Sequence, residues 1–129
     1  MKQLVVVCDD RVGLLAEISE MLATKGINIE NCSAEVIGPK AVVRLVVKDE
    51  TEAKKILETN SFNVVSMEFL SVKLEDKPGQ LSKIARLLAD NGIQIENIHM
   101  MVRERGRGVY ALKVDDKEKA RELLKDYLV

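Results

Sequence analysis

The stretch DRVGLL at residues 10–15 decides how this chain is interpreted, because it returns as DKPGQL at residues 76–81. A second stretch, GINIEN at residues 26–31, returns as GIQIEN at residues 92–97. Both recur at an offset of 66 residues, and 12 of the 27 positions from 10 to 36 are identical at that offset. Such self-similarity indicates one structural unit built twice. Any site built on the repeat is therefore expected twice.

The composition is that of a soluble globular protein. The chain has 129 residues, of which 47% are hydrophobic and 32% are charged, and its formal net charge is −1. Residues 1–66 carry 8 basic and 10 acidic side chains, and the remainder carries 12 and 11, so neither half has the basic excess of a nucleic-acid-binding domain. The two cysteines form no CxxC motif, and no apolar run is long enough for a signal peptide or a membrane span. We expect a cytoplasmic protein.

Apolar periodicity predicts the order strand, helix, strand, strand, helix, strand in the first copy. The residues of its first helix that share one face follow helical spacing: Leu14, Leu15, Ile18, Met21 and Leu22. Gly26 is expected to end that helix. The expected strands are residues 2–8, 27–36, 41–48 and 62–67, and the expected second helix is residues 51–59.

The second copy follows the same pattern from residue 69, with a one-residue insertion in its hairpin at residues 103–108. Val129 aligns with Phe62, so this copy lacks a fourth strand. The sequence therefore predicts an α+β protein of two ferredoxin-like βαββαβ units with antiparallel sheets, the second without its final strand. The expected domains are residues 1–68 and 69–129, joined without a linker.

The missing strand leaves residues 69–75 as an open sheet edge. Proteins cover, charge or pair such edges. On this ground we expect a homo-oligomer, most simply a dimer. The alternative is that the charged side chains of Lys73 and Glu75 keep the edge solvated.

The repeated loop has the chemistry of a small-molecule site. Gly13 and Gly79 lie where a strand turns into a helix, and a glycine there either lets a ligand approach the backbone or permits a tight turn. The N–H groups at the helix start attract an anion such as a carboxylate. Asn28 can both donate and accept hydrogen bonds. Asp10 and Asp76 are alternatively helix caps or first-turn acids.

The pattern D-[RK]-x-G-x-L, a helix ending in Gly, then I-[NQ]-I-E-N resembles the ACT domain, a family of small amino-acid-sensing regulatory modules with ferredoxin-like topology. The resemblance covers nearly the whole chain, twice. It implies an effector held between paired modules, with Asn28 at a position that commonly contacts it. The second copy has the longer Gln94 there, and Val12 replaces the more typical proline that the second copy keeps as Pro78.

The candidate ligand-binding residues are the two loops with their helix starts and the two positions at the beginning of the next strand. In the first copy they are Asp10, Arg11, Val12, Gly13, Leu14, Leu15, Asn28 and Ile29. In the second copy they are Asp76, Lys77, Pro78, Gly79, Gln80, Leu81, Gln94 and Ile95.

Other chemistries find little support. His99 is the one histidine, and it is expected to be structural rather than catalytic. Cys8 is either a small core residue or a reactive thiol, and no metal-ligand spacing is present. The few aromatic residues do not suit RNA-recognition modules of the same topology. The basic hairpin with Arg103, Arg105 and Arg107 is either a solvated turn or a contact for an anion or partner.

The function expected is that of a sensor of a free amino acid or related small metabolite, which regulates a metabolic enzyme in trans. No catalytic activity, cofactor, metal, nucleic acid or membrane is expected. The alternative is a dimerisation scaffold that binds no ligand.

Overall fold

The computed structural model describes residues 2–129, which form two compact units, Lys2–Met67 and Glu68–Val129. We call them the first and the second unit. Both are α+β with antiparallel sheets, which confirms the predicted fold class. None of the helices among residues 2–129 has the length and hydrophobicity that crossing a bilayer requires.

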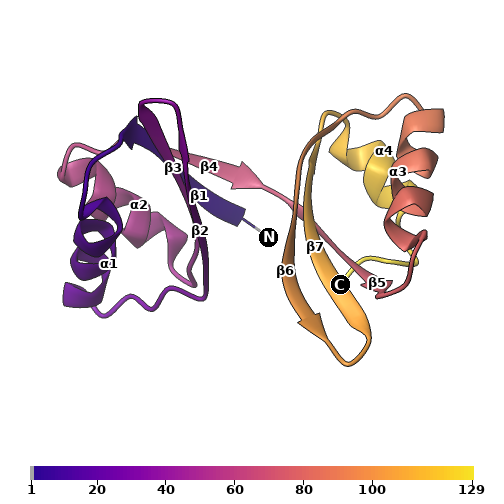
Figure 1. Ribbon diagram of the computed structural model, residues 1–129, viewed down its shortest axis with the longest axis horizontal. Coiled ribbons are helices and arrows are strands. Elements are labelled where there is room, and N and C mark those ends of the chain that lie inside the picture. Colours follow the sequence, from indigo (N-terminus) through magenta and orange to yellow (C-terminus); the bar gives the residue numbers. More distant parts are fainter. Residues whose placement is uncertain (1) are drawn as a thin grey trace. The chain divides into compact units, whose positions relative to one another are not determined.

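The first unit has the predicted βαββαβ order. Its elements are β1 (Lys2–Asp9), α1 (Leu14–Thr24), β2 (Asn31–Ile37), β3 (Lys40–Val46), α2 (Glu50–Thr59) and β4 (Val64–Glu68). The sheet order is β2-β3-β1-β4, and both helices lie on one face of it (Figure 1). The core between sheet and helices is fully apolar, and Ile18, Leu22 and Leu57 are completely buried in it.

Two strands of the first unit begin later than predicted. The strand expected at residue 27 begins at Asn31, because the Ile27 N–H still bonds to the Leu22 carbonyl and closes α1. The strand expected at residue 62 begins at Val64, because the Phe62 N–H closes α2 on the Leu57 carbonyl in the same way.

The second unit repeats this arrangement with three strands. Its elements are β5 (Leu70–Glu75), α3 (Gln80–Asp90), β6 (Ile95–Glu104), β7 (Arg107–Val114) and α4 (Lys117–Leu123). The sheet order is β5-β7-β6, with α3 and α4 on one face (Figure 1). Ile84, Leu88 and Leu112 are completely buried in its core. The predicted absence of a fourth named strand is confirmed.

The sequence analysis placed the extra residue of the second copy in the hairpin at residues 103–108. The structure places it in strand β6 instead. Both hairpins have two-residue turns, Gly38-Pro39 and Arg105-Gly106. The register of β6 against β7 shifts between Met100 and Val102, so Met101 is the inserted residue of a β-bulge. The sheet absorbs the insertion there because a bulge leaves the turn geometry unchanged.

The prediction that the edge of β5 is open is wrong, because residues 127–129 pair with it. Leu128 forms an isolated antiparallel bridge with Val72. The Lys73 N–H donates to the Tyr127 carbonyl at 2.8 Å, and the Val129 N–H donates to the Ser71 carbonyl at 3.0 Å. A three-residue segment thus takes the place of the fourth strand, so the open edge no longer argues for oligomerisation.

Each unit's second helix begins with a side-chain cap. Oδ1 of Asp49 accepts from the Glu52 N–H, and Oδ1 of Asp116 accepts from the Lys119 N–H, both at 3.1 Å. We expect Asp116→Ala to lower the free energy of unfolding by about 1 kcal/mol, because the replacement leaves a helix N–H without its acceptor. Urea denaturation measures the change. Asp116→Asn keeps an acceptor, and equal destabilisation by Asn and Ala would contradict the capping role.

Candidate functional site

The two loops before α1 and α3 have the same backbone. Gly13 and Gly79 are left-handed, with φ of +86° and +87°, and each immediately precedes its helix. Neither helix receives a side-chain hydrogen bond at this cap, so the alternative that Asp10 and Asp76 are helix caps is wrong. The N–H groups of Leu14 and Gln80 donate to the Arg11 and Lys77 carbonyls at 3.3 Å. The next two N–H groups of each helix are therefore those that can meet an anionic ligand.

Asp10 and Asp76 each form a backbone hydrogen bond to the hairpin of their own unit. The Asp10 N–H donates to the Pro39 carbonyl at 3.0 Å, and the Asp76 N–H donates to the Gly106 carbonyl at 2.8 Å. In the second unit the Asp76 carboxylate also receives Nε and Nη2 of Arg103, at 3.1 and 3.2 Å. The sequence analysis named these aspartates as candidate ligand-binding residues and gave no sign that the hairpin is their partner.

A hollow of about 280 Å³ lies beside the first loop. It brings together five of the predicted residues, Asp10, Arg11, Gly13, Leu14 and Leu15. Strands β2 and β3 supply the rest of its lining, which the sequence analysis did not include: Ala34, Glu35, Val36, Ala41 and Val43. Apolar side chains on one wall and a helix start on the other suit a small molecule with a carboxylate.

The remaining loop residues are placed less uniformly. Val12 is fully exposed and does not line that hollow. In the second unit, Lys77, Pro78 and Leu81 are exposed. Gly79 and Gln80 line two different hollows rather than one. The second loop is therefore not a copy of the first in its surroundings.

Asn28 is far from the loop glycine of its own unit. Helix α1, with 11 residues, separates them, which corresponds to about 16 Å of helix. Asn28 lines another hollow of about 390 Å³. One amino acid cannot contact both Gly13 and Asn28 of the same unit, so a site that uses both features needs two modules.

The hollow at Asn28 contains charges of both signs. Lys25 and Lys48 face it together with Glu30, Asp49 and Glu52, and they surround the exposed amide of Asn28. This combination suits a zwitterion, whose ammonium and carboxylate need opposite partners. The position of Asn28 was predicted from the repeat, whereas the surrounding charges come from other elements.

Gln94 is already engaged in the second unit. Its Nε2 donates to the Ile95 carbonyl at 3.2 Å, and its backbone N–H donates to Asp115 at 3.0 Å. The structure gives the Asn28 side chain no comparable bond within residues 2–129. The neighbouring Ile29 and Ile95 pack partly buried against the cores of their units, which leaves only the amide side chains facing outward.

The groups considered for catalysis have structural surroundings. Nδ1 of His99 lies 3.1 Å from Oδ1 of Asn97, and its ring meets Phe69 edge to face with centroids 5.6 Å apart. Burial raises the pKa of the Cys8 thiol, although Arg11 lowers it in part, so the reactive thiolate is disfavoured. Within residues 2–129 no three His, Cys, Asp or Glu side chains are placed to hold a metal ion.

A substitution at the loop separates the two interpretations of Gly13. A Cβ at this position would meet no atom within 4 Å, so the cost of Gly13→Ala comes from the left-handed backbone alone, about 1–2 kcal/mol of stability. We expect Gly79→Ala to cost the same. If Gly13 also receives a ligand, Gly13→Ala weakens binding beyond this loss, as calorimetric titration of the folded variant would show. Unchanged affinity would mean that Gly13 serves only to permit a tight turn.

Two ferredoxin-like units, each with a left-handed glycine before its first helix and an amide side chain after it, define a tandem-repeat α+β protein. A family model described as an ACT domain pair matches residues 1–128. The chain therefore belongs to the ACT domain pair family, which confirms the resemblance seen in the sequence. A search of curated protein sequences gives no match.

Solved structures with similar folds cover nearly the whole chain. Protein BT0572 from Bacteroides thetaiotaomicron is 25% identical with a TM-score of 0.87, and the match covers 99% of this chain and 90% of that one. The ligand-free regulatory subunit of aspartate kinase from Thermus thermophilus is 19% identical with a TM-score of 0.70, covering 97% and 91%. The structure of aspartokinase alpha and beta subunits is 20% identical with a TM-score of 0.65, and the match covers 97% of this chain and 90% of that one. The last two show similarity of fold.

Proposed function

We propose that this protein senses a free amino acid, or a closely related small metabolite, and regulates a metabolic enzyme in trans in the cytoplasm. The observation that carries the proposal is the Asn28 hollow, in which an amide without a side-chain partner faces charges of both signs. Membership of the ACT domain pair family supports it, as does the fold shared with a regulatory subunit of aspartate kinase.

The effector would lie between paired modules, because Gly13 and Asn28 of one unit are too far apart to share it. We propose that two copies of the chain form the pair as a homodimer. The edge strands β2 and β6 support this, because each exposes apolar side chains: Val36 and Ile37 on β2, and Met100 and Val102 on β6. The ligand would act by its differential affinity for two arrangements of the modules.

A thermal-unfolding screen against the proteinogenic amino acids and their precursors tests the proposal. A ligand present at 100 times its Kd adds about 2.7 kcal/mol to the stability of the folded state. We expect one selective hit. Light scattering in the same samples reports the oligomeric state. A flat screen with a folded oligomer would favour the dimerisation scaffold, and a folded monomer would contradict the pairing.

A further inference from the structure

Three of the cationic side chains of the second unit that form no ion pair line one hollow together. They come from three elements: Lys73 from β5, Arg107 from β7 and Lys83 from α3. Within residues 2–129, no carboxylate forms an ion pair with any of them. Cations that line one hollow from separate elements are able to hold an anion between them.

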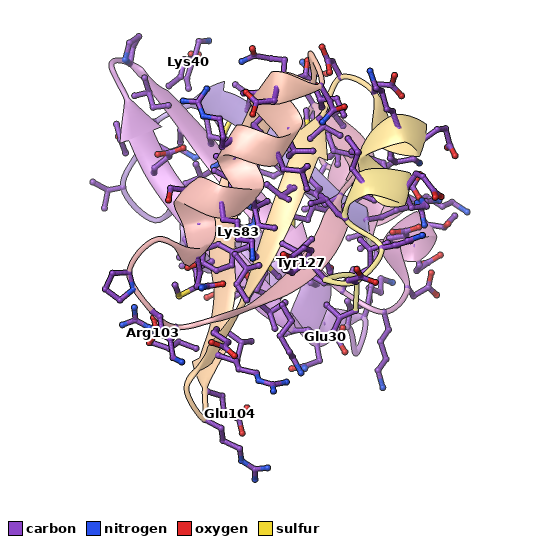
Figure 2. All side chains as sticks on the ribbon, turned by 90° about the vertical axis from the view of Figure 1, so that its right-hand side faces the viewer. Glu30, Lys40, Lys83, Arg103, Glu104 and Tyr127 are labelled. Atoms are coloured by element: carbon purple, nitrogen blue, oxygen red, sulfur yellow. The ribbon has the colours of Figure 1, made fainter. Side chains whose placement is uncertain are left out.

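These cations line two adjoining hollows. One, of about 440 Å³, lies at the hairpin end of the sheet and also contains Arg105. The other, of about 450 Å³, lies between β5, the start of α3 and the end of the chain, and contains Lys83 and Tyr127. Lys73 and Arg107 line both. Figure 2 shows Lys83 and Tyr127 on the same side of the second unit, with Glu104 at the end of the hairpin.

The nearby acidic side chains do not neutralise Arg107. Glu75 and Glu104 lie opposite Arg107 in the strand register. Glu75 pairs instead with Lys77 at 3.2 Å, and Glu104 pairs with Arg105 at 3.7 Å. Asp126 is the one further acidic side chain in the lining of these hollows. Positive charge therefore remains where the two hollows meet.

The first unit lacks this cluster on the same backbone. Val7 stands in the place of Lys73 and Glu17 in the place of Lys83. Lys40 corresponds to Arg107, but its Nζ lies 2.6 Å from Oδ1 of Asp9, and Glu17 is paired with Arg11. The repeat therefore supplies an internal comparison in which one copy pairs its charges and the other leaves three cations unpaired.

We propose that Lys73, Lys83 and Arg107 bind a small anion of the phosphate or phosphate-monoester type on the second unit. The guanidinium of Arg107 suits two phosphate oxygens at once, the lysines act as point charges, and the Tyr127 hydroxyl is a further donor. A zwitterionic amino acid is disfavoured, because three cations would repel its ammonium. This site is separate from Gly13 and Asn28, and it gives the protein a second class of ligand.

Titration of the full chain with inorganic phosphate and with glycerol 3-phosphate tests the proposal, followed by ¹H–¹⁵N spectra at constant ionic strength with chloride as the reference anion. We expect saturable shifts at the amides of Lys73, Lys83 and Arg107. Tighter binding of the ester would identify a phosphorylated metabolite as the source of the anion, and equal or tighter binding of inorganic phosphate would identify the free ion.

Replacing two of the cations together provides the decisive comparison. Lys73→Gln with Arg107→Gln should weaken phosphate binding about tenfold or more, because two charged hydrogen-bond donors are lost. Lys40→Gln, at the place in the first unit that corresponds to Arg107, should leave phosphate binding unchanged. Non-saturating shifts spread over many surface lysines, or unchanged binding by the double variant, would overturn the proposal.

The outcome is independent of the proposed amino-acid site. Asn28→Ala should retain phosphate binding, because Asn28 lies in the first unit and outside both hollows. Loss of phosphate binding by this variant would overturn the separation of the two sites. A flat amino-acid screen together with saturable phosphate binding would reject the proposed function and keep the anion site.

Discussion

Leu22→Ala should lower the free energy of unfolding of the first unit by about 2–5 kcal/mol. Leu22 is completely buried between α1 and the sheet, so truncation removes apolar contacts and leaves a cavity. A unit of this size has a stability of only about 3–10 kcal/mol. The loss is therefore a large share of the total.

The repeat provides a matched variant, Leu88→Ala, at the corresponding place in the second unit. Leu88 is also completely buried, in a core of its own. Hydrogen exchange should show that each substitution lowers protection mainly in the unit that carries it. Leu22→Met, which nearly conserves volume, should cost less than about 1.5 kcal/mol. Equal loss of protection in both units would mean that they unfold as one cooperative block.

Asn28→Ala should abolish most of the stabilisation that the amino-acid effector confers, which is about 2.7 kcal/mol at 100 times the Kd. The substitution removes a side chain that can bond both to a carboxylate and to an ammonium. Because Asn28 is exposed, the stability without ligand should change by less than about 0.5 kcal/mol. Thermal unfolding with and without the effector measures both quantities.

Gln94→Ala is the matched control for this prediction. The Gln94 side chain already donates to the Ile95 carbonyl, so we expect its removal to reduce effector binding less than Asn28→Ala does. Equal effects would mean that both copies contribute equally. If neither substitution altered the ligand-induced stabilisation, the effector would bind elsewhere, while an effect on assembly alone would favour the scaffold.

Much of the fold could be predicted from the sequence because the signals are local. Helical spacing of apolar residues gave α1 and its end near Gly26, and the offset of 66 residues transferred the same reasoning to α3 and Gly92. The loop glycines were recognised by position, and their left-handed φ accounts for the residue type. The caps Asp49 and Asp116 occupy corresponding positions before α2 and α4, but their role was not predicted.

The predictions of the inserted residue and of the open edge were wrong because both depend on hydrogen bonds between segments that are far apart in the chain. An alignment of the copies places an extra residue in a hairpin, but only the pairing of β6 with β7 locates it at Met101. Similarly, the alignment of the copies places Val129 at Phe62, so no strand was expected after α4. The bridge between Leu128 and Val72 forms because the edge of β5 offers hydrogen-bond partners that local sequence does not reveal.

The sequence by itself determined that one α+β unit occurs twice, where its helices begin and end, and which loop and amide positions correspond between the copies. Tertiary structure decided what surrounds those positions. It separated Gly13 from Asn28 by the length of α1, placed charges of both signs around Asn28, and left Lys73 and Arg107 unpaired. The physical reason is that periodicity records which side of an element is buried, whereas charge pairing depends on elements far apart in the chain.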